Sequence, residues 1–233
     1  MLGDGMKILA SDFDNTIFYE DNPDINGKNI EAIRKFVSYG NIFCIITGRN
    51  FTSLKQYLTK YNIPYSYLVC EDGAKIFNNM DYCISTTYLS RNEIMTIEEV
   101  LKNEKCDYYL DDGYNKTEFL DDCVKVVVRC ADKKEQQRIV KCVKEKINVH
   151  IYASRSHVNI IHKSVNKRHA LKTLMNLEEL DYHLLHVIGD NDNDYEMLKE
   201  FDGAVIKEHH EILNELKKEE VETLSDYIEK LMN

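Results

Sequence analysis

Short apolar runs alternate with amphipathic segments through the first 70 residues of this chain. Lys7–Ser11, Ile42–Ile46 and Tyr65–Cys70 have the near-continuous apolar composition of buried parallel strands. Between them, residues 26–39 and a segment that begins at Phe51 repeat apolar side chains at helical spacing. Strand and helix in regular alternation predict a parallel sheet with helices on both faces. We therefore expect an α/β fold with a doubly wound, Rossmann-like core.

Residues 82–162 follow a different pattern. Five runs there have the composition of strands: residues 82–88, 106–110, 123–130, 147–153 and 157–162. Most of them alternate apolar and polar side chains, which is typical of a sheet with one solvated face. The strand and helix alternation of the core resumes near residue 166. We expect an α+β cap domain at residues 82–162, inserted between core segments at residues 1–81 and 163–233.

The balance of charge limits the partners of the protein. The chain has 40 acidic and 30 basic residues, a net charge of −10, and no basic stripe offsets it. This disfavours nucleic acid and anionic membranes as partners. No apolar stretch approaches the length needed to cross a bilayer. We therefore expect no nucleic acid and no membrane partner. A small anionic substrate could still bind if a few basic side chains and a cation make one pocket locally positive.

The cysteines indicate the cellular compartment. There are seven of them, with no C-x-x-C pair, and most lie in apolar, strand-like runs. An odd number of thiols without a secretory signal fits a reducing environment. We expect a cytoplasmic protein that is a monomer or a weak homodimer.

Two carboxylates follow the first apolar strand directly. Asp12 and Asp14 stand two positions apart, so in extended backbone both side chains face the same way. Two carboxylates this close repel each other unless a proton or a cation lies between them. An oxygen-preferring ion such as magnesium fits that position. The alternative is a simple loop start in which Asp14 and Thr16 cap a turn.

Three further motifs stand at strand or helix ends. They are Thr47-Gly48-Arg49, Lys167 at a helix start, and the acidic run Gly189–Asp194. The carboxyl ends of parallel strands share one edge of a sheet, so these motifs and the Asp12 motif can meet there. In order and spacing the chain resembles the haloacid dehalogenase (HAD) superfamily of phosphohydrolases. The resemblance is closest to the Cof-type branch, in which a C2-type α+β cap follows the third core strand.

This resemblance implies a role for each acidic residue. Asp12 would be the nucleophile and would form an aspartyl phosphate. Asp14 would protonate the leaving group and then activate water, as a general acid and base. Magnesium would bridge Asp12, the backbone carbonyl of Asp14 and the side chain of Asp190. Asn193 and Asp194 would orient the metal ligands or the catalytic lysine.

The resemblance also implies the groups that bind the phosphoryl oxygens. Thr47 would hydrogen-bond them, together with the turn that contains Gly48 and Arg49. Lys167 would place a compact positive charge beside Asp12 and the phosphate. Taken singly, each residue has a simpler interpretation: Thr47 and Gly48 as a plain turn, and Arg49 or Lys167 as a solvated cation.

Two positions depart from the family pattern. Asp72-Gly73-Ala74 stands where Asn-Gly-Ala is common, and Arg168 stands where glycine is frequent. A carboxylate at position 72 is unfavourable beside an anionic substrate unless it binds a hydroxyl or an amino group. We therefore include Asp72 among the residues predicted to bind substrate.

Residues of the cap should set specificity. The candidates are Arg155, His157, Asn159 and Tyr114, of which Arg155 is our predicted substrate contact. Alternating polar residues in a half-exposed strand, however, need no ligand. The pair His209-His210 is interpreted as solvated surface.

The resulting prediction is a HAD-type phosphoric monoester hydrolase that depends on magnesium. Its partner would be a small phosphorylated metabolite such as a sugar phosphate. A phosphomutase of the same superfamily and a phospho-ligand sensor without turnover are the alternatives. The complete set of Asp12, Asp14, Thr47, Lys167 and Asp190 argues against the sensor.

Overall fold

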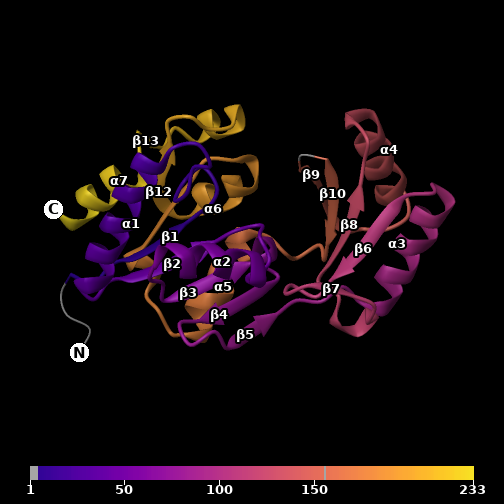
Figure 1. The fold of residues 1–233 in the computed structure, drawn as a ribbon, viewed down its shortest axis with the longest axis horizontal. Helices are drawn as coiled ribbons and strands as arrows, with labels where there is room; N and C mark the ends of the chain where they lie inside the picture. The colour runs from indigo at the N-terminus through magenta and orange to yellow at the C-terminus, as the bar shows by residue number, and fades with distance from the viewer. Residues whose placement is uncertain (1–4, 155) are drawn as a thin grey trace.

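The structure is a computed structural model that describes residues 5–154 and 156–233. Its strands form two sheets, one of eight strands and one of five, which lie side by side (Figure 1). The larger sheet has the order β13-β12-β11-β1-β2-β3-β4-β5. Its strands are β1 (Ile8–Ser11), β2 (Ile42–Ile46), β3 (Tyr67–Cys70), β4 (Lys75–Asn78), β5 (Cys83–Thr86), β11 (Leu185–Gly189), β12 (Asp202–Ile206) and β13 (Glu219–Val221).

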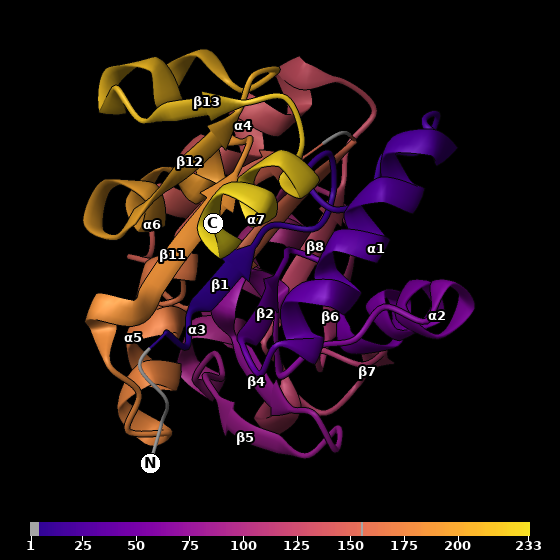
Figure 2. The ribbon, with the colours of Figure 1, turned by 90° about the vertical axis from the view of Figure 1, so that its left-hand side faces the viewer.

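Helices cover both faces of this core sheet. The strands from β13 to β3 are parallel to one another, whereas β4 pairs antiparallel with both of its neighbours, β3 and β5. Apolar side chains of α1 (Pro23–Ser38), α2 (Phe51–Tyr61) and α7 (Leu224–Met232) pack on one face. Those of α5 (Lys167–Leu177) and α6 (Tyr195–Glu200) pack on the other (Figure 2). The predicted doubly wound α/β core is confirmed.

Local capping fixes two helix starts that carry predicted site residues. The side chain of Asn50 accepts from the Ser53 N–H at 2.8 Å and begins α2 directly after the Thr47 turn. Asn166 accepts from the His169 N–H at 2.8 Å, so that Lys167 is the first residue of α5. Asparagine is among the residues that satisfy the free N–H groups of a helix start best.

The smaller sheet is antiparallel and has helices on one face only. Its order is β7-β6-β8-β10-β9, and it packs against α3 (Arg91–Asn103) and α4 (Lys133–Lys144). The strands are β6 (Asp107–Asp111), β7 (Lys116–Thr117), β8 (Lys125–Arg129), β9 (His150–Ser154) and β10 (His157–Ile161). Along β8, Val126 and Val128 face the helices. The alternating residues of the strand, such as Val127, belong to the opposite face. This is the α+β sheet that the sequence predicts.

The strand β5 belongs to a different sheet from the one that its sequence context indicates. The pattern groups residues 82–88 with the cap, but β5 pairs with β4 at the edge of the core sheet. The composition of a strand shows that it is extended and does not show which strand it joins. We keep the division into core and inserted cap as a proposal, with the first cap element after β5.

None of the described helices is long and apolar enough to span a membrane.

Candidate active site

A cleft of about 720 Å³ lies between the carboxyl ends of the core strands and the helix-free face of the cap sheet. Most of the sequence-predicted residues line it. From the core these are Asp12, Asp14, Thr47, Gly48, Arg49, Asp72 and Asn193. From the cap, His157 and Asn159 line it, together with Tyr109, Asp111, Lys125 and Tyr152. The cleft therefore brings together motifs that lie far apart in the sequence.

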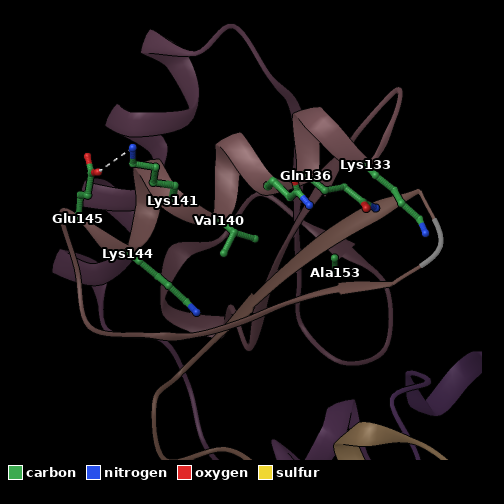
Figure 3. Close-up of a pocket in the computed structure, with 8 residues that line it drawn as sticks. Lys133, Gln136, Val140, Lys141, Lys144, Glu145 and Ala153 are labelled. Atoms are coloured by element: carbon green, nitrogen blue, oxygen red, sulfur yellow. Dashed lines mark ion pairs between the residues drawn. The ribbon is translucent and has the colours of Figure 1, made fainter. Parts of the chain in front are cut away.

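A second hollow of about 830 Å³ lies between α4 and β9 of the cap, and Ala153 lines both it and the cleft (Figure 3). Its lining is Val140, Ala153 and a group of lysine and glutamine side chains from α4. The ion pair between Lys141 and Glu145, 3.9 Å apart, lies at its rim. Among the described residues, none that is predicted to act on a substrate lines it, so the candidate active site is the cleft between core and cap.

Lys167 joins the carboxylate of Asp12, which lines the cleft, to that of the buried Asp194. Its Nζ donates to Asp12 Oδ1 at 2.5 Å and to Asp194 Oδ1 at 2.6 Å, and all three side chains are buried. Burial by itself lowers the pKa of Lys167, but the charges of Asp12 and Asp194 outweigh it and raise that pKa. The lysine is therefore charged and lies directly against the predicted nucleophile.

Asp12, Asp190 and Asp194 form one buried group of acids. One oxygen from each of the three carboxylates lies within 4.8 Å of the others. Burial, with the charges of Asp194 and Asp190, raises the pKa of Asp12 well above its usual value in spite of Lys167. Burial and Asp194 likewise raise the pKa of Asp190 to about 6. The three carboxylates carry more negative charge than one lysine neutralises. Their oxygens are suitable ligands for a divalent, oxygen-preferring cation.

Neighbouring groups hold these acids in place. Thr16 Oγ1 donates to Asp190 Oδ1 at 3.0 Å. Asp194 Oδ2 accepts from the backbone N–H groups of Asp190 and Asn191, both at 3.1 Å. Gly189 is required beside them, because a Cβ there would lie 2.5 Å from Asp194 Oδ2. Asp194 is thus held by Lys167 and by its own loop, and Asp12 and Asp190 keep oxygens for a cation.

The side chain of Asp14 lies apart from the acidic group and pairs with Arg49. Arg49 Nε and Nη2 donate to the two carboxylate oxygens at 2.8 and 2.6 Å. The guanidinium also stacks on the ring of Tyr57, 4.5 Å from its centroid. The sequence predicts Arg49 as a substrate contact, and in this structure its partner is Asp14.

Thr47 is buried at the end of β2, and its Oγ1 accepts from the Arg49 N–H at 3.2 Å. The next residue, Gly48, lies against Asp72, since a Cβ on Gly48 would be 3.0 Å from Asp72 Oδ1. The Asp72 N–H donates to the Thr47 carbonyl at 3.0 Å. Asp72 therefore adjoins the turn predicted to bind the phosphoryl group.

Two contacts connect the cap to the loop that carries Asp72. Tyr152 OH donates to Asp72 Oδ2, and Lys125 forms a buried ion pair with Glu71. Lys125 Nζ also donates to the Gly48 carbonyl at 3.2 Å. The sequence pattern did not indicate Lys125, Glu71 or Tyr152. The signal for Lys125 is a charged residue inside an apolar run, but its partner is not readable from the pattern.

The remaining predicted residues have varied positions. Tyr114 packs against Phe51 and Phe77, and the structure does not place it in the lining of the cleft. Arg155 lies outside the described residues. Arg168 pairs with acids of α6, Glu200 among them at 3.3 Å. His210 is exposed, as predicted, and it also lines the cleft, where its backbone N–H donates to the Asp190 carbonyl at 2.8 Å.

A model of the family of haloacid dehalogenase-like hydrolases matches residues 9–117 and 110–205. The chain therefore belongs to this family of hydrolases, as the motifs predict. Solved structures with low sequence identity share its fold. A protein from Plasmodium vivax described as a "putative HAD/COF-like hydrolase" has 17% sequence identity and a TM-score of 0.83, with 99% of this chain and 96% of that one covered.

One further solved structure has the same fold, and one curated protein is similar in sequence. A haloacid dehalogenase-like hydrolase from Bacteroides thetaiotaomicron has 13% identity and a TM-score of 0.82, with 97% of this chain and 99% of that one covered. A curated protein of Metamycoplasma hominis, "Putative phosphatase in upp 3'region", is 32% identical over 109 residues. That match covers 45% of this chain and 38% of the relative. The matched region thus spans well under half of the curated relative.

Proposed function

We propose that this protein is a magnesium-dependent phosphatase that hydrolyses small phosphomonoesters. The observation that carries the proposal is the contact of Lys167 with Asp12 inside a buried group of three carboxylates, of which Asp12 lines the cleft. A cation at that group and the lysine would neutralise the charge of a phosphoryl group, which otherwise repels an attacking carboxylate. The name of the M. hominis relative supports the same activity.

In the proposed reaction, an oxygen of Asp12 attacks phosphorus and the bond from phosphorus to the ester oxygen breaks. The leaving oxygen takes a proton from Asp14, and the phosphoryl group remains on Asp12 as an acyl phosphate. Asp14 then removes a proton from water, which attacks phosphorus and releases phosphate. Thr47 and Lys167 hold the phosphoryl oxygens throughout. Magnesium held by Asp12, Asp190 and the Asp14 carbonyl would supply charge neutralisation.

The cap limits what can enter. The cleft of about 720 Å³ is lined from both the core and the cap, and the cap contacts the core through Tyr152 and Lys125. A space of this size suits a small phosphorylated metabolite. All seven cysteines are free thiols, which supports the cytoplasmic location that we include in this proposal.

Phosphate release from a panel of phosphomonoesters, with and without magnesium, tests the proposal. The wild type should release phosphate only with the metal, and Asp12→Asn should release almost none while keeping the wild-type circular dichroism spectrum. A hexose phosphate that is isomerised without release of phosphate would point to a mutase. Binding of esters with no turnover of any of them would point to a sensor.

A further inference from the structure

The groups around Asp72 present hydrogen-bond acceptors to the cleft. Asp72 is 3% exposed and lines the cleft next to the Thr47 turn. Its carboxylate accepts from Tyr152 OH and, at 3.1 Å, from Asn193 Nδ2. Each carboxylate oxygen can accept more than one hydrogen bond, so both retain capacity for a ligand.

The partners of Asp72 are thereby fixed in orientation. An ionised carboxylate only accepts, so Tyr152 must give its hydroxyl proton to Asp72 and keeps only acceptor capacity. For the same reason the amide nitrogen of Asn193 must face Asp72, which decides the orientation of the amide. Its oxygen, Oδ1, is then left buried without a partner among the described residues. A buried acceptor without a protein donor needs a donor from outside the protein, which a water molecule or a ligand can supply.

The cations among the described lining residues, Arg49 and Lys125, are already paired. Arg49 holds both oxygens of Asp14. Lys125 is buried against Glu71 and the Gly48 carbonyl. The side of the cleft that contains Asp72 thus keeps an uncompensated negative charge and free acceptors.

We infer that Asp72 is a specificity-determining residue, which selects phosphomonoesters whose leaving group carries an ammonium or hydroxyl donor near the ester oxygen and discriminates against a carboxylate there. The inference rests on the proposed function and specifies its substrate class. Since Asp72 adjoins the Thr47 turn, the donor it meets lies on the first carbons of the leaving group. Gly48 allows this closeness, because a side chain at that position would meet the Asp72 carboxylate.

The test uses four esters that differ in one group: 2-aminoethyl phosphate, 2-hydroxyethyl phosphate, propyl phosphate and phosphoglycolate. With magnesium, kcat/KM of the wild type should be about tenfold or more higher for the aminoethyl ester than for propyl phosphate or phosphoglycolate, as expected for a hydrogen bond to a charged group. In Asp72→Asn, the ratio of aminoethyl phosphate to phosphoglycolate should fall about tenfold. Asparagine tolerates the backbone φ of 55° at this position.

Two further variants separate charge from structure. Tyr152→Phe removes the contact with the cap and keeps the carboxylate, so the ratio should stay within about threefold of the wild type. Glu31→Gln makes the same change of charge at an exposed position of α1 and should leave the ratio unchanged. A wild type that cleaves phosphoglycolate as well as aminoethyl phosphate would overturn the inference, and so would an unchanged ratio in Asp72→Asn.

Binding of the same esters to Asp12→Asn with magnesium, measured by calorimetry, separates this inference from the proposed function. The order of affinities should match the order of kcat/KM expected above. If the wild type cleaves no ester, the proposed function fails, but this order of affinities still supports the role of Asp72. Equal affinities, or no binding of any of the four, would overturn that role.

Discussion

Arg49 donates to both carboxylate oxygens of Asp14, through Nε at 2.8 Å and Nη2 at 2.6 Å. Such a two-point contact fixes the plane of the carboxylate, which a lysine cannot do. We propose that Arg49 positions the general acid. The position of Asp14 in the acid step then depends on the arginine.

Arg49→Lys should therefore slow the hydrolysis of alkyl esters more than the hydrolysis of p-nitrophenyl phosphate. The alkoxide needs a proton to leave, whereas p-nitrophenolate leaves without one. We expect kcat for an alkyl ester to fall about tenfold further than kcat for p-nitrophenyl phosphate, within the range for general acid catalysis. Steady-state kinetics with both esters measure this. Equal losses for the two would instead assign Arg49 to the phosphoryl group that they share.

Thr16 holds the carboxylate of Asp190 through a hydrogen bond of 3.0 Å. Thr16→Val has nearly the same shape but no hydroxyl, so Asp190 should lose its orientation toward a cation. We expect the dissociation constant for magnesium to rise about tenfold or more, as is usual when a partner of a metal ligand is lost. Thr16→Ser keeps the hydroxyl and serves as the control. Equal metal affinity of the Val and Ser variants would exclude this role.

The raised pKa of Asp190 predicts how magnesium and pH together affect the free energy of unfolding. Burial, the largest cause, and Asp194 raise that pKa from 3.8 to about 6. The protonated carboxyl of Asp190 favours the folded state. Its contribution to the free energy of unfolding is therefore complete below the pKa of the unfolded state, and it is lost as the pH rises through the pKa of the folded state. The free energy of unfolding of the metal-free protein should therefore fall as the pH rises from about 4 to about 6.

Magnesium binds the ionised carboxylate and should reverse this loss. Urea unfolding with and without the metal should therefore show greater stabilisation by magnesium above about pH 7 than at about pH 5. In Asp190→Asn both the pH effect and the metal effect should be smaller. Equal stabilisation by magnesium at the two pH values would contradict the assignment of Asp190.

Lys167 is 1% exposed and neutralises part of the acidic group. Lys167→Met should lower kcat by roughly 10²–10³, the usual effect of removing one preorganised electrostatic contact. It should also destabilise the metal-free protein by about 3–5 kcal/mol, because Asp12 and Asp194 lose a buried partner. Chemical denaturation and kinetics on one preparation measure both. A stable variant with wild-type kcat would show that the lysine serves neither purpose.

The core fold and the motifs at the ends of its strands could be predicted because local patterns specify them. The apolar runs of β1 and β2 end at polar motifs, and parallel strands bring such ends together. The capping residue Asn166 places Lys167 at the start of α5. The order and spacing of these motifs carry the resemblance to the family, and that resemblance implies the roles of Asp12, Thr47 and Lys167.

Contacts between separate segments could not be predicted in this way. β5 joins the core sheet through its pairing with β4, which its composition does not specify. The partner of Lys125 is Glu71, at the other side of the cleft, and the partner of Arg49 is Asp14. These pairs depend on how the cap and the loops dock on the core, and the apolar pattern carries no information about that.

The most direct test of the account is to find where the phosphoryl group goes. The wild type would be quenched during turnover of a phosphomonoester with magnesium, and the acyl phosphate reduced with borohydride, which converts a phosphorylated aspartate to homoserine. Peptide mass spectrometry should find homoserine at position 12 and not at positions 14, 190 or 194. Steady release of phosphate with no modification of Asp12, or from Asp12→Asn at the wild-type rate, would contradict the account.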